Sequence, residues 1–211
     1  MAAKISFIKS AVFKKDYPHH NKLEVAFMGR SNAGKSSLIN NLTKSKIAKV
    51  SQTPGKTRLL NFFDFSKYVL VDMPGYGYAS RSGSEIAEWQ PMIEAYLAER
   101  DSLVGLVLVM DIRRKWTKEE LVLVQFVHSH GRAVAIALTK SDKISKLEAQ
   151  KFLAKHKKDS KVDAVFVISN TKKIGYEHLE DYIYKYWIKD VETENVYEDE
   201  IDDHESDEAE S

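Results

Sequence analysis

The clearest chemistry in the sequence lies in one short stretch, Gly29-Arg30-Ser31-Asn32-Ala33-Gly34-Lys35-Ser36. Its spacing matches G-x-x-x-x-G-K-[ST], in which the glycines let the backbone wrap around phosphates and successive N–H groups point inward. Lys35 can reach the β- and γ-phosphates of a nucleotide, and the Ser36 hydroxyl can ligate Mg²⁺. The stretch lies between a predicted strand and a predicted helix, as the motif requires. It therefore predicts a phosphate site, but it does not choose between ATP and GTP.

A second motif, Thr139-Lys140-Ser141-Asp142, follows another predicted strand. The Asp142 carboxylate can accept hydrogen bonds from N1–H and the exocyclic amine of guanine, and adenine offers no such donor pair. A site built around buried polar groups rejects analogues that leave those groups unpaired. Lys140 would lie against the base and sugar, and the loop Ser169-Asn170-Thr171-Lys172 would supply a backbone contact to guanine O6. These two loops predict guanine specificity.

Two further motifs lie between the first pair, at Thr53–Arg58 and at Asp72-Met73-Pro74-Gly75. Asp72 fits the acidic residue that holds Mg²⁺, directly or through water, and the Gly75 N–H fits a contact to the γ-phosphate. Thr57 is the candidate switch threonine, whose hydroxyl would complete the Mg²⁺ shell and whose backbone would touch the γ-phosphate. Loss of that phosphate would release both loops. The candidate catalytic residues are therefore Lys35, Thr57 and Gly75.

Apolar strands and amphipathic helices alternate along the chain and would position these motifs. Strands are predicted at 23–28, 59–65, 68–72, 103–111, 133–138 and 164–168, with helices at 35–42 and around 86–97, 121–127 and 174–187. Uninterrupted apolar runs are typical of parallel strands covered on both faces. Pro91 is expected to start or kink the second helix. In the last helix, the residues expected to face the core are Ile174, Leu179, Ile183, Tyr186 and Trp187. The pattern predicts an α/β fold, a three-layer Ras-like P-loop domain with a mostly parallel six-stranded sheet and motifs at the carboxyl ends of its strands.

The 211 residues suit one domain with extensions. We expect an N-terminal extension at 1–20 that could add an edge strand, a nucleotide-binding domain at 21–190, and a disordered acidic tail at 191–211. The sequence has no cysteine, which excludes disulfides and thiolate metal sites. No apolar run approaches the roughly 20 residues needed to cross a bilayer. We therefore expect a cytoplasmic monomer without a membrane partner.

The formal net charge of +1 hides a strong asymmetry. Residues 192–211 hold eleven Asp or Glu and no Lys or Arg, so residues 1–191 carry +12 once the tail's −11 is removed from the total. A body this basic suggests a polyanionic partner. Basic residues gather after two predicted strands, at Arg113-Arg114-Lys115 and at Lys140, Lys143, Lys146, Lys151, Lys155, Lys157, Lys158 and Lys161.

We interpret this basic cluster as a contact for RNA, with DNA not expected as a partner. The alternative is a lysine-rich helix face that is merely solvated. The tail could cover the basic face and compete with RNA, or it could be a solubilising extension without a further role.

The motifs together resemble the EngB (YihA/YsxC) family of bacterial GTPases, in the TrmE-Era-EngA-EngB-Septin-like class. The resemblance rests on 29–37, 53–57, 72–79 and 139–142, with Gly75-Tyr76-Gly77-Tyr78-Ala79 the most specific, and it spans about residues 5 to 188. It implies a GTP-binding protein that hydrolyses GTP to GDP, assists assembly of the large ribosomal subunit and is needed for normal cell division and septation.

Carried over residue by residue, the resemblance implies Mg²⁺ on Ser36 and Thr57 and a larger set of nucleotide contacts. That set comprises Gly29, Arg30, Ser31, Asn32, Ala33, Gly34, Lys35, Ser36, Gly55, Lys56, Thr57, Arg58, Leu59, Asp72, Met73, Pro74, Gly75, Thr139, Lys140, Ser141, Asp142, Ile168, Ser169 and Asn170. Asn32 also resembles an asparagine that ligates K⁺ in some relatives, which suggests potassium as a second cation.

Tyr76 is a departure from Ras-like enzymes, which place a water-orienting glutamine at this position. A phenol is a poor substitute for that amide, so we expect slow intrinsic hydrolysis. Two other classes of function stay open. One is a P-loop kinase that acts on a small molecule, against which Asp142 argues. The other is a GTP-gated protein-interaction switch in cell division that does not act through RNA.

Overall fold

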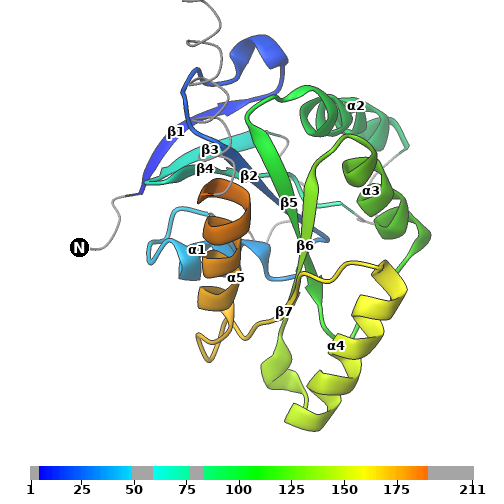
Figure 1. Ribbon diagram of the computed structural model, residues 1–211. Helices are drawn as coiled ribbons and strands as arrows, with labels where there is room; N and C mark the ends of the chain where they lie inside the picture. Colours follow the sequence, from blue (N-terminus) through cyan, green and yellow to red (C-terminus); the bar gives the residue numbers. More distant parts are fainter. Residues whose placement is uncertain (1–4, 49–58, 77–82, 190–211) are drawn as a thin grey trace, which may run out of the picture.

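A computed structural model of the protein describes residues 5–48, 59–76 and 83–189, with only the main chain at 83–90. Within these residues, seven strands form one sheet in the order β1-β3-β4-β2-β5-β6-β7 (Figure 1). The strands are β1 Ser6–Ala11, β2 Glu24–Gly29, β3 Leu60–Phe65, β4 Tyr68–Asp72, β5 Leu103–Asp111, β6 Ala133–Thr139 and β7 Val165–Val167. The five α-helices described are α1 Lys35–Leu42, α2 Gly83–Glu99, α3 Lys118–Ser129, α4 Lys146–Ser160 and α5 Tyr176–Ile183. Shorter helical segments are the 3₁₀-helices η1 Lys14–Asp16 and η2 Ser141–Lys143 and the π-helix η3 Tyr184–Lys189.

The sheet is parallel from β4 through β2, β5 and β6 to β7, and antiparallel where β3 joins β4 and β1 joins β3. It has one strand more than the six predicted, because β1 adds to the edge in the segment where the sequence suggested an extra strand. The parallel strands point the same way, so the loops after β2, β4, β5, β6 and β7 all lie at one end of the sheet.

Two apolar layers hold the helices against the sheet, as the continuous apolar strands predicted. On one face, Leu38 and Leu179 bring α1 and α5 onto the sheet. On the other face, Tyr96 and Val127 belong to a layer that packs α2, α3 and partly buried residues of α4 against it. Central residues of β5 such as Val107 are fully buried, because helices cover both sides.

Two details of the helices bear on the sequence prediction. Pro91 lies inside α2, so of the two predicted alternatives the helix start at Pro91 is excluded and the kink stays a prediction. Tyr186, predicted to face the core, is 49% exposed, whereas Trp187 is 4% exposed. The reason is that α5 passes into a π-helix at Tyr184–Lys189, whose wider winding changes which residues share a face.

Some predictions fall on residues outside the described ones. These are the first switch motif, with Gly55, Lys56, Thr57 and Arg58, and the acidic tail from residue 191 onward. Within the described residues, no helix is both long and apolar enough to cross a membrane.

Candidate functional site

The loop between β2 and α1 contains two glycines that its geometry requires. At Gly29, a Cβ atom would lie 2.5 Å from the carbonyl oxygen of Val109 on the adjacent strand β5. Gly34, the N-cap of α1, has φ of 90°, in the left-handed region that favours glycine. The loop thus brings the N-terminus of α1 to the carboxyl end of β2, where its N–H groups and helix dipole favour an anion.

Lys35 and Asp72 meet at the centre of this end of the sheet. Lys35 is the first residue of α1, and its Nζ atom forms an ion pair with Oδ1 of Asp72 at the end of β4. The two side chains are 12% and 9% exposed. They meet because β2 and β4 are adjacent parallel strands. The Asp72 carboxylate and the Ser36 hydroxyl are oxygen donors of the kind that Mg²⁺ takes together with phosphate oxygens.

The main chain after Asp72 lies directly against the phosphate loop. Tyr76 N donates a 3.3 Å hydrogen bond to Gly29 O, and Ser31 N donates a 3.2 Å hydrogen bond to Tyr76 O. A Cβ atom at Gly75 would lie 3.2 Å from that same carbonyl of Gly29. The second switch motif therefore starts in contact with the loop expected to hold the phosphates.

The side chain of Tyr76 points away from that loop. Its hydroxyl donates a 3.2 Å hydrogen bond to Oε1 of Glu120 in α3, and Tyr76 is 7% exposed. Burial and the nearby charge of Glu120 raise the pKa of the Tyr76 phenol far above its usual range. Glu120 also accepts a 2.8 Å hydrogen bond from Thr117 N and a 2.9 Å bond from its hydroxyl. The phenol is thus a protonated donor inside the fold.

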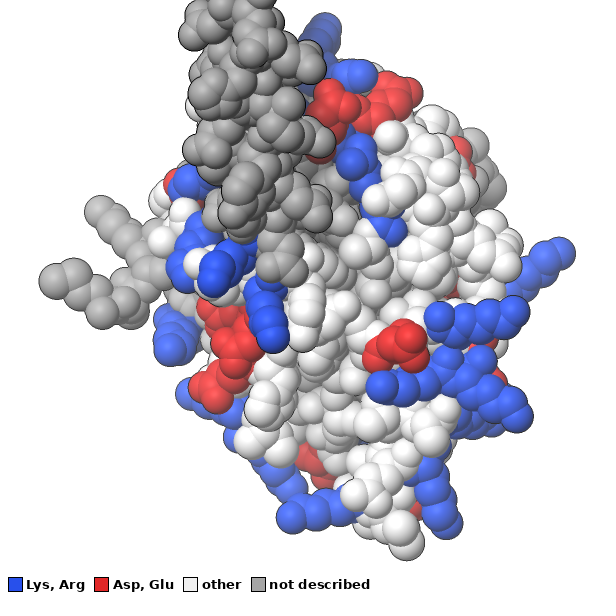
Figure 2. Space-filling view, viewed as in Figure 1, with Lys and Arg blue, Asp and Glu red and all other residues white. Residues whose placement is uncertain are grey.

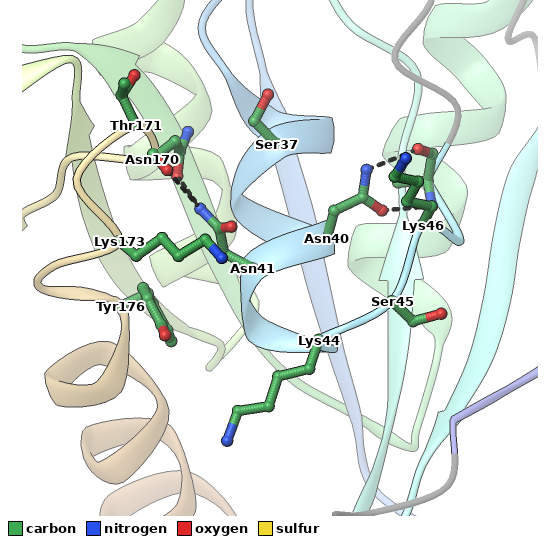
Figure 3. A pocket seen from close by; sticks show the side chains of 11 residues that line it. Ser37, Asn40, Asn41, Lys44, Ser45, Lys46, Asn170, Thr171, Lys173 and Tyr176 are labelled. Atoms are coloured by element: carbon green, nitrogen blue, oxygen red, sulfur yellow. Dashed lines mark hydrogen bonds between the residues drawn. The ribbon is translucent and has the colours of Figure 1, made fainter.

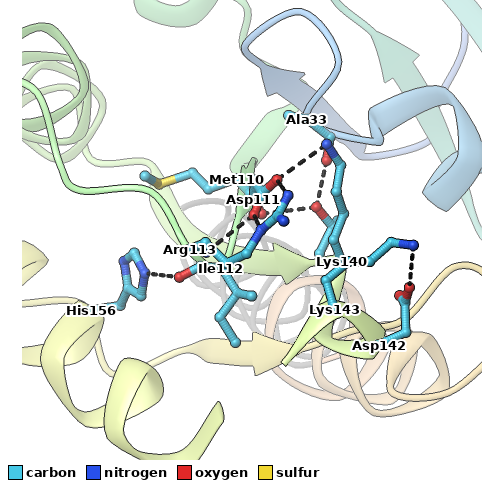
Figure 4. Close-up of polar contacts among 10 residues, drawn as sticks. Ala33, Met110, Asp111, Ile112, Arg113, Lys140, Asp142, Lys143 and His156 are labelled. Atoms are coloured by element: carbon cyan, nitrogen blue, oxygen red, sulfur yellow. Dashed lines mark hydrogen bonds and ion pairs between the residues drawn. The ribbon is translucent and has the colours of Figure 1, made fainter. Parts of the chain in front are cut away.

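Asp142 and Ser169 bring the two predicted guanine-reading loops together. The Ser169 hydroxyl donates a 2.8 Å hydrogen bond to Oδ1 of Asp142, and Ser141 N donates a 3.2 Å bond to Ile168 O. The hydrogen bond from Ser169 lowers the pKa of the Asp142 carboxyl. Thr139 is fully buried, and its hydroxyl contacts the carbonyls of Ala33 and Met110, which ties this loop to the phosphate loop (Figure 4).

Asp111, at the end of β5, organises the basic residues beside this loop. Arg113 donates to it from Nε at 2.9 Å and from a terminal nitrogen at 2.7 Å, and the Nζ atom of Lys140 lies 3.2 Å away (Figure 4). Burial of Asp111 opposes its charged form, but the hydrogen bonds from Arg113 and Lys140 lower the pKa of its carboxyl to about 2. Asp111 therefore positions Lys140, the predicted base-contacting lysine.

Asn41 and Asn170 connect α1 to the loop after β7. Nδ2 of Asn41 donates a 3.0 Å hydrogen bond to Asn170 O (Figure 3). Nδ2 of Asn170 in turn donates a 3.0 Å bond to Gly34 O. The second guanine-reading loop is therefore fastened to the phosphate loop by side-chain hydrogen bonds.

The structure gathers the described parts of the predicted site, which are residues 29–36, 72–75, 139–142 and 168–170, at the carboxyl ends of β2, β4, β6 and β7. The side chains of Met73 and Ile168 are fully buried in the core, so only their main chains are available to a ligand. Leu59 lies just before β3 and is 38% exposed. Sequence reasoning missed Glu120, Asp111 and Asn41 as neighbours of the site.

Comparisons with known proteins agree with this arrangement. The family model "50S ribosome-binding GTPase" matches residues 24–140. "Probable GTP-binding protein EngB" of Bdellovibrio bacteriovorus is 59% identical over 191 residues, covering 90% of this chain and 96% of that protein. The protein of the same name from Clostridium beijerinckii is 43% identical over 194 residues, covering 90% and 98%.

Two solved structures show the same fold. The crystal structure of a probable GTP-binding protein engB has a TM-score of 0.65 and 24% identity, covering 77% of this chain and 97% of that one. Era in complex with MgGDPNP and a fragment of 16S ribosomal RNA has a TM-score of 0.64 and 24% identity, covering 79% and 57%.

The mostly parallel sheet, the phosphate loop and the loops after β4 and β6 define a P-loop GTPase. The identity to its relatives extends over nine-tenths of the chain. The chain belongs to the EngB family of GTP-binding proteins.

Proposed function

We propose that this GTPase binds GTP with Mg²⁺, hydrolyses it slowly, and acts as a switch in assembly of the large ribosomal subunit. The carrying observation is that the Lys35–Asp72 and Asp142–Ser169 pairs lie at the same end of the sheet. The first pair supplies a cation and a carboxylate for metal-bound phosphates, and the second supplies a carboxylate for guanine. A P-loop kinase specific for adenine would have no use for Asp142 in this position.

In the proposed site, the N–H groups of residues 31–36 surround the phosphates and Lys35 stabilises charge on the transferring phosphoryl group. Ser36 and Thr57 would hold Mg²⁺, with Asp72 bound directly or through water, and the ion would neutralise phosphate charge. The Gly75 N–H would contact the γ-phosphate. Thr57 enters this proposal from the sequence alone, because it lies outside the described residues.

The proposal of slow hydrolysis is supported by the direction of the Tyr76 side chain. The phenol donates to buried Glu120, so it is not available to orient a water molecule at the γ-phosphate. Positioning of the attacking water is a major part of catalysis in GTPases. A partner that positions the attacking water would raise the rate of GTP hydrolysis. The GTP-bound state would then end only when that partner is bound.

Potassium is a further proposal, and it rests on Asn32. This residue has φ of 62° and lies exposed on the phosphate loop, and an asparagine side-chain oxygen can accept a cation as a ligand. Measuring GTP hydrolysis in K⁺ and in Na⁺ at equal ionic strength tests the idea. We expect faster hydrolysis in K⁺, and equal rates would remove potassium from the mechanism.

The proposed RNA contact lies on α4 and the loop before α3. Lysines 143, 146, 151, 155, 157, 158 and 161 are all exposed, as are Arg113, Arg114 and Lys115. Figure 2 shows Lys and Arg side chains gathered over the end of the molecule that carries α4. This face adjoins the base-reading loop through Lys140 and Asp111. A change of nucleotide could therefore alter the shape of the RNA-binding face.

Co-sedimentation with large ribosomal subunits tests this function. We expect binding that is stronger with GTP than with GDP and that weakens steeply with salt, because lysine–phosphate contacts release counterions. Replacing Lys155 and Lys158 by glutamine should weaken binding, and the same change at Lys14 and Lys15 serves as the control. If binding to the subunits is equally strong with GTP and GDP and does not change with salt concentration, the proposal is contradicted. That result would favour the protein-interaction switch in cell division.

A further inference from the structure

An open cavity of about 830 Å³ lies between α1, the residues that follow it, and the loop that leads into α5 (Figure 3). Its lining combines lysines, amides and one aromatic ring, principally Lys44, Lys46, Lys173, Asn40, Asn41 and Tyr176. None of the described residues that line it is Asp or Glu. The cavity therefore offers positive charge, hydrogen-bond donors and acceptors, and a surface on which a flat ring can stack.

This combination matches the chemistry of a nucleoside phosphate. Lysine ammonium groups bind phosphate as point charges. Asparagine amides both donate and accept, which suits the edge of a base, and a tyrosine ring provides a stacking surface. The volume is also that of a site for a ligand of nucleotide size. We propose that the cavity is a second binding site, for a nucleoside phosphate that is either an unpaired nucleotide of RNA or a free nucleotide.

The cavity is distinct from the predicted GTP site. Among its lining residues, Asn170 and Thr171 belong to the predicted guanine-reading loop, and the others lie outside the predicted GTP contacts. In Figure 3 the lining follows α1 from Ser37 near the phosphate loop to Lys44 beyond the helix end, and the Lys173 side chain reaches toward Asn41. A ligand here would lie along the side of α1, whereas the phosphates of GTP would lie at its N-terminus.

Hydrogen bonds connect residues that line the cavity to the phosphate loop and to the residues that lead into the first switch motif. Asn41 holds Asn170, which donates to Gly34 O on the phosphate loop. Asn40 both donates to Ala48 O at 3.0 Å and accepts from Ala48 N at 2.9 Å, at the entry to the first switch motif. A ligand that contacts these amides would change how firmly the GTP site is held, and GTP-site occupancy would change the ligand's affinity by the same factor.

Lys44 is less suited to a decisive test than the other two lysines. Burial raises the pKa of Glu180 on α5, and the charge of Lys44 opposes that rise, so the two side chains are electrostatic neighbours. Replacing Lys44 would therefore also disturb α5. Lys46 and Lys173 are exposed, and their replacement by glutamine removes two charges while keeping an unbranched stem and a polar end group.

The test uses the full chain saturated with GDP, so that the GTP site is occupied. A short fluorescent oligouridylate and uridine monophosphate are the probes. Whichever probe wild type binds is the responding probe. We expect the K46Q/K173Q variant to bind that probe with an affinity at least about tenfold lower than that of wild type. Its GDP affinity and its thermal unfolding midpoint should be unchanged. The K14Q/K15Q control changes two residues of the short 3₁₀-helix η1, Lys14–Asp16, which do not line the cavity, and it should bind like wild type (Figure 1).

The two probes separate the two sources of ligand. Binding of uridine monophosphate points to a free nucleotide, and binding of the oligonucleotide alone points to RNA. A K155Q/K158Q variant separates this cavity from the α4 face, because only α4 binding should suffer from it. Undiminished binding of the responding probe by K46Q/K173Q, or no binding of either probe by wild type, would overturn the proposed site.

The coupling between the cavity and the GTP site is tested separately, by the rate of GDP release. A bound probe should slow the release of a fluorescent GDP analogue from wild type by about fivefold. The reason is that the probe would stabilise the hydrogen bond from Asn170 to Gly34 O on the phosphate loop. Replacing Asn41 by alanine should remove that slowing. A release rate that the probe does not change would overturn the coupling.

Discussion

The hydroxyl of Tyr76 donates a hydrogen bond to the buried carboxylate of Glu120, which joins the second switch motif to the first turn of α3. The same carboxylate caps α3 by accepting from Thr117, so one buried charge serves both contacts. Meanwhile, the main chain of Tyr76 is bonded to Gly29 and Ser31 in the phosphate loop. A movement of Tyr76 would therefore change its hydrogen bonds to the phosphate loop and to α3 at the same time.

Replacing Tyr76 by phenylalanine separates the structural role of the phenol from any catalytic one. The change leaves Glu120 with one hydrogen bond fewer in a buried position, so we expect the free energy of unfolding to fall by about 1–3 kcal/mol. GTP hydrolysis should stay near the wild-type rate, because the phenol faces α3. Urea unfolding and a phosphate-release assay measure the two quantities.

The matched control for this experiment is Y186F, because Tyr186 is half exposed. Its loss of a phenol should change stability by no more than about 0.5 kcal/mol. A folded Y76F protein that loses most of its hydrolysis rate would show that the phenol does act on the nucleotide.

The sequence predicted those parts of the fold whose signals are local. β4 and β5 are continuous apolar runs, and the phosphate loop follows a strand and opens a helix, so their positions could be read directly. The sequence also placed the motifs of Lys35 and Asp72 at one end of a parallel sheet, and the structure shows that the two side chains form an ion pair there.

The contacts that sequence reasoning missed are long-range. The capping box of Thr117 and Glu120 is readable as T-x-x-E, but its second partner, Tyr76, lies 44 residues away. In the sequence, Asn41 has no signal beyond that of a polar helix residue. Its hydrogen-bond partner Asn170 lies 129 residues further along the chain. Tyr186 was misplaced because the helical period of 3.6 fails where the last turns become a π-helix.

Replacing Asp142 by asparagine should change the base that the site accepts. The amide can no longer accept from both guanine donors, so GTP affinity should fall on the order of a hundredfold or more, and affinity for xanthosine triphosphate should rise. Competition binding against a fluorescent GDP analogue measures both. D159N makes the same chemical change at an exposed position of α4 and should leave both affinities unchanged. Unaltered GTP affinity in D142N would refute the base-reading role.

Removing Mg²⁺ should expose the role of Asp72. In wild type, a chelator should speed release of a fluorescent GDP analogue about tenfold or more, because the phosphates lose the ion that neutralises them. The D72N variant should already release GDP quickly and should respond little to the chelator. D64N, on the neighbouring strand β3, is the control and should behave like wild type. An equal chelator response in D72N and wild type would remove Asp72 from the metal site.

Acid should weaken the fold partly through Asp111. The pKa of its carboxyl is about 2 in the folded chain and 3.8 in an unperturbed aspartate, so its contribution is present above about pH 4 and is lost as the pH falls toward 2. That difference corresponds to at most about 2.5 kcal/mol. Arg113 and Lys140 are partly exposed, at 47% and 34%, and solvent screening reduces the expected contribution to about 1 kcal/mol.

Urea unfolding of wild type and D111N, followed from neutral pH down to about pH 2, measures this contribution. D111N should be the less stable protein near pH 7, and the gap should narrow as the pH falls, because protonated Asp111 in wild type also lacks its charge. D101N, at an exposed position just before β5, should instead follow the wild-type curve at every pH. A gap between D111N and wild type that stays constant from pH 7 to about pH 2 would mean that Asp111 acts through its shape and not through its charge.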